Sequence, residues 1–144
     1  MAHQETLKKF AETRAQMQAG GGEDRIKAQH EKGKLTARER LERLLDQGSF
    51  VEDQPYVTGR STEFGMDTKR FYGDGVVSGS GKVEGKQVWF ASQDFTVLGG
   101  SLGEMHAERI AAAQENAIRT GSPFIAVNDS GGARIQEGVL SLHG

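Results

Sequence analysis

Hydrophobic and polar positions in the first third of the chain follow the rhythm of amphipathic helices. Residues 3–19 predict one such helix, which three glycines bring to an end. A second short helix is expected over residues 23–31. Thr36 and Glu39 have the spacing of a capping box and open a third helix, whose leucines turn inward. The apolar side of the first helix comprises Leu7, Phe10, Ala11, Arg14 and Met17.

The middle of the chain has the two-residue rhythm of a β-hairpin. One strand is expected over residues 76–83 and the returning strand over residues 87–91, with Glu84-Gly85 at the turn. A helix is then expected over residues 102–119, with its apolar residues largely on one face. That face comprises Met105, Ile110, Ala113, Ala117 and Ile118.

The stretch from Pro123 to Arg134 predicts a strand, a glycine turn and the start of a helix. Residues 124–127 form a short apolar run, which is typical of a strand buried on both faces. The chain then turns through residues 128–132. From Ala133 the spacing becomes helical, and the positions that indicate it are Ile135, Val139 and Leu142.

The same order of strand, glycine turn and helix occurs earlier, around Gly99-Gly100-Ser101. A right-handed crossover between two neighbouring parallel strands would bring both turns to one edge of the sheet. Glycines let a ligand approach the backbone, and the first amides of a helix lack partners within it. Two such sets of donors at one oxygen would make an oxyanion hole. Each turn taken alone is equally consistent with a tight bend that binds nothing.

Composition removes several other classes of protein. The chain has 144 residues with 20 glycines, a formal net charge of -2 and no cysteine, which excludes a disulfide framework and cysteine chemistry. The four histidines fit no metal-ligand spacing, so no metal is expected. No apolar run reaches the roughly 18 residues needed to cross a bilayer, and no signal or transit peptide is recognised. The expected location is the cytoplasm, or the mitochondrial matrix in a eukaryote.

A basic cluster lies on and between the second and third helices, and two interpretations of it stay open. It comprises Lys27, His30, Lys32, Lys34, Arg38, Arg40 and Arg43. A solvated helix face is the ordinary interpretation. A polyphosphate site is the more specific interpretation, because neighbouring cations can neutralise clustered phosphates. Nucleic acid is not expected, because acidic residues are interleaved among the basic ones and stacking aromatic residues are lacking.

Side-chain catalysts are hard to find in this sequence. Ser130 follows a strand, but position 128 is Asn, so the nucleophile-elbow pattern G-x-S-x-G is not met. Ser130 is therefore interpreted as a cap or a ligand contact, and a serine hydrolase is the disfavoured alternative. Asp94 and Glu104 are interpreted as solvated or capping acids. The glycines between residues 73 and 85 precede a strand, which argues against a dinucleotide site.

Four ordered motifs resemble a known family. They are KLTARERLERLLD at residues 34–46, FYGDGVVSGSG at residues 71–81, ASQDFTVLGGSLGE at residues 91–104 and DSGGARIQEG at residues 129–138. Together they are similar to the amino-terminal part of the carboxyltransferase (β) subunits of biotin-dependent acyl-CoA carboxylases, of the propionyl-CoA carboxylase and methylmalonyl-CoA carboxyltransferase type. The resemblance covers essentially the whole chain.

The resemblance implies an α/β, crotonase-like (ClpP/crotonase) fold of repeated ββα units. Residues 1–48 would be an amino-terminal helical segment, and residues 49–144 the first part of the acyl-CoA domain of a longer chain. It also implies trimers of dimers and a partner biotin carboxylase or biotin carrier subunit. The implied substrate is a coenzyme A thioester, and carboxybiotin would arrive from the carboxyl-terminal domain of the opposite subunit.

The resemblance also implies roles for particular residues. The amides of Gly131, Gly132 and Ala133 would hold the thioester oxygen as the α-carbon becomes an enolate. The turn that contains Val97, Gly99, Gly100 and Ser101 would lie beside the thioester and the pantetheine arm, and is a candidate for the second donor. Lys34 and Arg38 become candidate contacts for the phosphates of coenzyme A. The α-proton would go to biotin itself, in agreement with the lack of a side-chain base.

Two alternatives stay open within the same family. The chain could belong to a biotin-dependent acyl-CoA decarboxylase, in which the reaction runs the other way. It could also be a non-catalytic fragment or assembly piece. The isolated chain is expected to bind coenzyme A weakly or not at all and to be poorly soluble, because a half-built domain exposes apolar faces.

Overall fold

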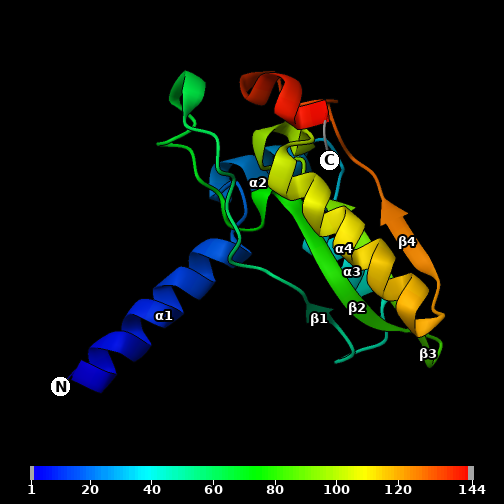
Figure 1. The fold of residues 1–144 in the computed structure, drawn as a ribbon. Helices are drawn as coiled ribbons and strands as arrows, with labels where there is room; N and C mark the ends of the chain where they lie inside the picture. The colour runs from blue at the N-terminus through cyan, green and yellow to red at the C-terminus, as the bar shows by residue number, and fades with distance from the viewer. Residues whose placement is uncertain (1, 143–144) are drawn as a thin grey trace.

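A four-stranded sheet with the order β1-β2-β3-β4 forms the middle of the protein, in a computed structural model that describes residues 2–142 (Figure 1). The strands are β1 (Val51–Glu52), β2 (Val76–Val83), β3 (Lys86–Gln93) and β4 (Phe124–Val127). β2 pairs antiparallel with β1 and β3, whereas β3 pairs parallel with β4. The hairpin predicted from the two-residue rhythm and the parallel pair at the glycine turns are both confirmed.

One face of the sheet carries α3 (Ala37–Leu44) and the main hydrophobic core. The capping box that opens α3 is present, because the Glu39 amide donates to Thr36 Oγ1 and the Thr36 amide donates to the Glu39 carboxylate. Alternation along β2 and β3 turns every second residue toward this helix. The buried core residues are Ala37, Leu41, Leu45, Val77, Val88 and Phe90.

The other face of the sheet carries α4 (Glu104–Thr120), which packs along β2 and β3 (Figure 1). Ala113 and Ala117 are buried there. Gly121 ends the helix with a φ of 62°, a conformation that glycine adopts without strain. Ile118, which is expected on the same face as Ala113 and Ala117, is not buried with them and is 80% exposed.

The first two helices are α1 (Ala2–Gln18) and α2 (Glu23–Glu31), as the sequence predicts. α1 extends away from the sheet (Figure 1). Met17 at its end is buried, but Leu7 and Phe10 are 54% and 55% exposed. The expected apolar side of α1 therefore contacts the rest of the described protein at the buried Met17 and at Phe10, whose ring centre lies 6.1 Å from that of Tyr56.

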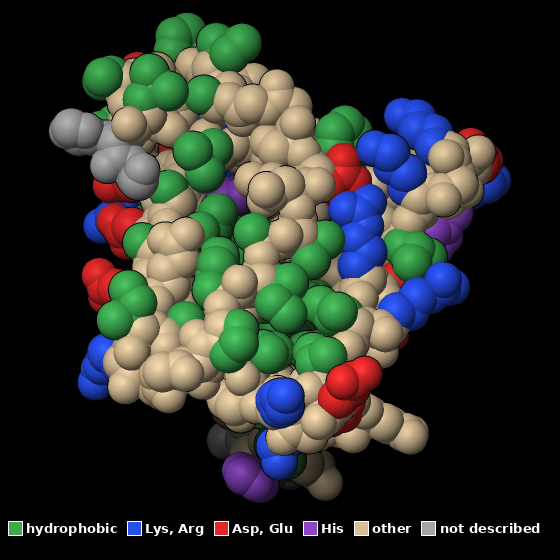
Figure 2. All heavy atoms as spheres, turned by 90° about the vertical axis from the view of Figure 1, so that its right-hand side faces the viewer, with side chains coloured by type: hydrophobic (Ala, Val, Ile, Leu, Met, Phe, Trp, Pro, Cys, Tyr) green, Lys and Arg blue, Asp and Glu red, His purple; other side chains and the backbone are tan. Residues whose placement is uncertain are grey.

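Two expectations about the far end of the chain are wrong. β4 is partly exposed, because it is the edge strand of the sheet in the described residues. The expected helix after Ala133 is a 3-10 segment, Ile135–Leu142, interrupted at Gly138. Ile135, Val139 and Leu142 are 87%, 74% and 71% exposed, because no further layer of the described residues covers them. Figure 2 shows apolar side chains gathered on the face that carries β4.

Short 3-10 segments connect the larger elements. They are Glu63–Gly65, Tyr72–Gly75 and Leu98–Gly100. Within residues 2–142, no helix combines the length and the apolar character that crossing a membrane requires.

Candidate functional site

The two glycine turns lie side by side at the carboxyl ends of β3 and β4. The Gly131 amide donates to the Gly99 carbonyl oxygen at 2.9 Å. Beyond the turns, the Leu102 amide donates to Gly132 and the Arg134 amide donates to Leu102, at 2.9 and 2.8 Å. These bonds form a short parallel bridge between Leu102 and Ala133. The structure therefore brings together the two turns that the sequence placed at one edge of the sheet.

Gly100 is the point of closest approach between the turns. Its φ is 63°, and a Cβ built at this position would lie 2.2 Å from the Asp129 carbonyl oxygen. Any larger residue would push the two turns apart, since backbone rather than a flexible side chain opposes it. Gly99 has a similar φ of 66°, but no atom lies within 4 Å of its hypothetical Cβ.

The amides of the Gly131-Gly132-Ala133 bend are not all free, which corrects the sequence-based expectation. The Gly131 amide is bonded to Gly99, and the Gly132 amide donates to Ser130 Oγ at 3.1 Å. For the Ala133 amide, no hydrogen-bond acceptor is found in the described part of the chain. All three residues are exposed. Ala133 is thus the donor of this bend that remains open to a ligand.

The Val97–Ser101 turn likewise uses most of its amides internally. Gly100 and Ser101 donate to the carbonyl oxygens of Val97 and Leu98, at 2.9 and 3.3 Å. The side chain of Val97 is 1% exposed and belongs to the core. The Gly99 amide has no acceptor among residues 2–142.

Two of the first amides of α4 are already bonded within the protein, contrary to expectation. The Glu104 amide donates to the Glu137 carboxylate at 2.8 Å, and the His106 amide donates to the Asp74 carboxylate at 3.1 Å. Negative side chains at a helix amino terminus satisfy its amides and its dipole. The protein's own acids therefore occupy the position that an anion would take.

Asp129 holds the turn after β4 in place through its side-chain carboxylate. Its carboxylate accepts hydrogen bonds from Lys34 at 3.2 Å, from Gln29 at 3.1 Å and from Arg40. Partial burial raises the pKa of Asp129, but the hydrogen bonds from Arg40 and Lys34 outweigh this effect and hold the pKa below its usual value. Sequence reasoning treated Asp129 only as a turn residue, because spacing cannot show which distant cation reaches it.

The basic cluster of α2 and α3 separates into different roles. Arg38 makes a two-bond ion pair with Glu52, with N–O distances of 2.6 and 3.0 Å. This pairing argues against Arg38 as a phosphate contact. Lys34 is 49% exposed and lies 5.3 Å from the centre of the Phe95 ring. Although Lys34 also pairs with Asp129 at 3.2 Å, about half of its side chain is exposed, so a ligand can reach it.

A hollow of about 230 Å³ lies beside the Gly99 turn. The residues around it are Arg25, Ala28, Gln29, Lys32, Phe95, Thr96 and Gly99. It combines two cations with an aromatic ring and with the turn that carries an open amide. These groups suit the polar and aromatic parts of a long ligand.

A buried ionic cluster around Arg134 was not foreseen from the sequence. Arg134 is 0% exposed and its Nη1 lies 2.6 Å from Asp74 and 2.7 Å from Glu137. Its Nη2 donates to the carbonyl oxygen of Ser101 at 3.0 Å. Burial raises the pKa of Asp74, and the charge of Arg134 opposes this shift. The cluster connects the start of α4 to the short parallel bridge between Leu102 and Ala133.

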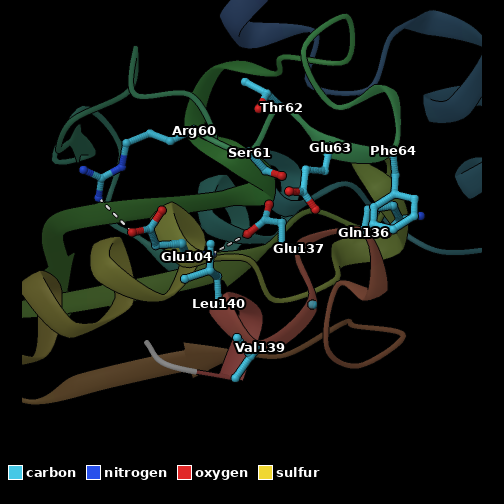
Figure 3. Close-up of a pocket in the computed structure, with 11 residues that line it drawn as sticks. Arg60, Ser61, Thr62, Glu63, Phe64, Glu104, Gln136, Glu137, Val139 and Leu140 are labelled. Carbon is cyan, nitrogen blue, oxygen red and sulfur yellow. Dashed lines mark hydrogen bonds and ion pairs between the residues drawn. The ribbon is translucent and has the colours of Figure 1, made fainter.

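A second hollow, of about 430 Å³, lies between the 60–64 loop and the 3-10 segment Ile135–Leu142 (Figure 3). Arg60 pairs with Glu104 and Glu108 at its edge, at 3.2 and 2.8 Å. Three glutamates line it, namely Glu63, Glu104 and Glu137. No group of acidic, histidine or cysteine side chains in the described residues is arranged to hold a metal ion. This acidic hollow does not suit a polyphosphate.

Ser130 has the contacts of a turn residue. Its Oγ accepts from the Gly132 amide, and no described histidine or carboxylate is bonded to it. His143, the histidine that follows Ser130 in the sequence, lies outside the described residues. The contacts of Ser130 give no support to a hydrolase.

Comparison with known proteins gives consistent matches. The carboxyl transferase domain model matches residues 28–144. The propionyl-CoA carboxylase beta chain of Cereibacter sphaeroides is 55% identical over 138 residues, which are 96% of this chain and 27% of that protein. The methylmalonyl-CoA decarboxylase subunit alpha of Veillonella parvula is 50% identical over 98% of this chain and 28% of that protein. The chain spans about a quarter of the length of these curated relatives.

Solved structures give the same result. A crystal structure of transcarboxylase 12S, a hexamer with methylmalonyl-coenzyme A and methylmalonic acid bound, superposes with a TM-score of 0.93 at 50% identity. The match covers 95% of this chain and 27% of that one. The fold is therefore crotonase-like, as expected, and β2, β3 and α4 form a ββα unit. Because the domain model covers most of the sequence and the relatives match nearly all of it, the chain belongs to the carboxyl transferase domain family.

Proposed function

We propose that this chain is the acyl-CoA-binding part of a carboxyltransferase subunit. The subunit would move a carboxyl group between carboxybiotin and the α-carbon of an acyl-CoA. The acyl-CoA would be of the propionyl-CoA or methylmalonyl-CoA type. The observation that carries the proposal is the pairing of the two glycine turns through the Gly131–Gly99 hydrogen bond. This pairing leaves the Ala133 amide open at an exposed bend. The identity to the propionyl-CoA carboxylase beta chain supports the choice of substrate.

In this proposal the Ala133 amide donates to the thioester oxygen. Carboxyl transfer to an acyl-CoA requires an electron pair at the α-carbon, and the corresponding negative charge develops on the thioester oxygen. A preorganised backbone donor stabilises that charge more in the transition state than in the ground state, and removing one such donor typically costs about two to three orders of magnitude in rate. The Gly99 amide is the candidate second donor.

Gly131, Gly132, Gly100, Ser101 and Ser130 have supporting roles in this proposal. The bonds of Gly131 and Gly132 hold the bend in shape, and Gly100 permits the close approach of the turns. Ser130 Oγ caps the bend. None of these groups needs to touch the substrate.

We further propose that the hollow beside Gly99 receives part of the coenzyme A moiety. Lys32 and Arg25 line it, and Lys34 lies close by over the Phe95 ring. Cations placed along one groove can neutralise the phosphates of coenzyme A.

Carboxybiotin would supply the carboxyl group, and the ureido nitrogen of biotin that loses this group would accept the proton of the α-carbon. The residues present are compatible with its approach, because Gly131, Gly132 and Ala133 are exposed and leave the bend open. A partner subunit or domain would deliver it. We propose the same trimer of dimers that the family implies, and the hexameric transcarboxylase 12S supports an oligomeric assembly.

Transfer assays on the full-length enzyme test this function. We expect exchange of the carboxyl group between methylmalonyl-CoA and biotin on its carrier, and loss of that exchange on replacing Gly132 with Val. Gly132 has a φ of 116°, so a β-branched residue would distort the bend that holds the Ala133 amide. Normal transfer by the Gly132→Val enzyme, or no transfer from any acyl-CoA by the unaltered enzyme, would overturn the proposal.

A decarboxylase subunit is the second candidate function. The subunit alpha of the Veillonella parvula methylmalonyl-CoA decarboxylase is 50% identical over nearly the whole chain, which supports it. Both functions use the same enolate and differ in direction. Net release of CO₂ from methylmalonyl-CoA by the holoenzyme without ATP favours the decarboxylase, whereas ATP-dependent carboxylation of propionyl-CoA favours the carboxylase.

A further inference from the structure

Gln93 and His106 connect the Asp129–Ala133 turn to the interior by a chain of hydrogen bonds. The Asp129 amide donates to Gln93 Oε1 at 3.1 Å. Gln93 Nε2 lies 3.4 Å from His106 Nε2. On the other side of the ring, His106 Nδ1 lies 3.0 Å from the carbonyl oxygen of Asp74. This series of hydrogen bonds therefore connects the buried carbonyl group of Asp74 to Asp129, the first residue of the turn.

Only one arrangement of protons satisfies every hydrogen bond in this series. The Asp74 carbonyl can only accept, so His106 Nδ1 carries the hydrogen and Nε2 is an acceptor. Gln93 then presents its NH₂ group to His106 and its carbonyl oxygen to the Asp129 amide. Reversing the Gln93 amide would place an acceptor against Nε2 and a donor against the Asp129 amide. His106 thus fixes the orientation of Gln93.

The surroundings of His106 keep its ring neutral. His106 is 0% exposed, and burial together with the positive charges of Arg134 and Arg109 lowers its pKa to about 4. Asp74 is the acid that faces it, through a hydrogen bond from the His106 amide at 3.1 Å. A neutral ring can accept from Gln93, whereas a protonated ring would not.

We propose that Gln93, oriented by His106, is a positioning residue that sets the Asp129–Ala133 turn for stabilising the enolate. The inference rests on the proposed function. Asp129 is held by Lys34 and Arg40 through its carboxylate, and by Gln93 through its amide. Because both the carboxylate and the backbone amide of Asp129 are held, the position of the bend is fixed. A displacement of about 1 Å at such a site can reduce the rate about a hundredfold.

Gln93→Leu in the full-length enzyme removes both hydrogen bonds of the side chain. We expect kcat for carboxyl transfer to fall about tenfold to a hundredfold, with KM for the acyl-CoA changed less than about threefold. Amide hydrogen exchange in residues 129–133 should become faster. The matched control is Gln87→Leu, the same change at an exposed position of the same strand, which should leave all three measurements unchanged.

Gln93→Glu separates positioning from general stability. The carboxylate still accepts from the Asp129 amide, but it faces the acceptor Nε2 of a neutral His106. One bound proton between the two groups restores the link, so it is present at low pH and lost as pH rises. We expect the kcat ratio of this variant to the unaltered enzyme to fall with rising pH. A loss of general stability would not produce that profile.

Each outcome has a definite meaning. An unchanged kcat and unchanged exchange in Gln93→Leu overturn the positioning role while the enolate proposal stands. A Gln93→Glu enzyme whose pH profile parallels that of the unaltered enzyme also overturns it, including where Gln93→Leu does not fold. If the unaltered enzyme transfers no carboxyl group, the proposed function fails, and the exchange rates of residues 129–133 still decide whether Gln93 orders the turn.

Discussion

Two arginine–aspartate clusters hold the same pair of turns, and they differ in burial. Arg134 is completely buried and pairs with Asp74 and Glu137, whereas Arg40 is 20% exposed and pairs with Asp129. A buried ion pair is costly to disrupt, because a lone charge then remains without water. A partly exposed pair can exchange its partner for water or for a ligand. The inner cluster is therefore expected to contribute more to stability, whereas the groups of the outer cluster remain partly accessible to solvent.

The largest effect should follow from removing the inner cation. Arg134→Met leaves Asp74 and Glu137 buried without their partner, so we expect the free energy of unfolding to fall by about 3–5 kcal/mol. Arg40→Met, the control in the outer cluster, should cost only about 1 kcal/mol. Denaturant titration of the full-length enzyme measures both, and equal losses would remove the distinction between the clusters.

The next largest effect should follow from disturbing the close contact between the two glycine turns, which both clusters hold in place. Gly100→Ala places a Cβ against the Asp129 carbonyl oxygen, so we expect kcat for carboxyl transfer to fall about a hundredfold. Gly99→Ala is the matched control, because its φ is nearly the same and its Cβ meets no atom within 4 Å. Steady-state kinetics decide, and a similar loss in both variants would point to backbone strain instead of displacement of the turns.

A smaller pair of effects tests whether the outer cations serve structure or substrate. Arg38→Met breaks the two-bond pair with Glu52, so we expect a loss of about 2 kcal/mol of stability with little change in KM. Lys34→Met should change stability by less than about 1 kcal/mol and raise KM for the acyl-CoA severalfold. Thermal unfolding and kinetics of the two variants measure this, and a raised KM in Arg38→Met would return that residue to the binding site.

The smallest effect is a pH dependence of opposite sign in the two clusters. The folded-state pKa of Asp129 is lowered, so its pairs contribute stability above its unfolded pKa of about 4 and lose it as pH falls. Asp129→Asn should therefore cost about 1 kcal/mol at neutral pH and nothing in strong acid. The pKa of Asp74 is raised, so its contribution declines as pH rises above its unfolded pKa. Unfolding free energies measured from pH 3 upward compare the two.

Local pattern predicted the elements of this protein well where neighbours along the chain decide them. The capping box of Thr36 and Glu39 and the hairpin turn at Glu84-Gly85 depend on residues a few positions apart. Pattern failed for the burial of β4 and for residues 135–142, because an apolar run or a helical spacing indicates only that a segment has an apolar face. Whether another layer covers that face depends on distant parts of a polypeptide.

The sequence by itself determined the two glycine turns, the parallel strands that carry them and the family that they indicate. Tertiary structure alone decided which amides remain free, because Gly131 and Gly132 donate to Gly99 and Ser130, whereas no acceptor for Ala133 is found in residues 2–142. It also decided that Asp129 meets Lys34 and Arg40, and that Arg134 is buried. The physical reason is that a hydrogen bond or an ion pair depends on distances of a few ångströms between groups up to 100 residues apart, and spacing along a chain does not contain those distances.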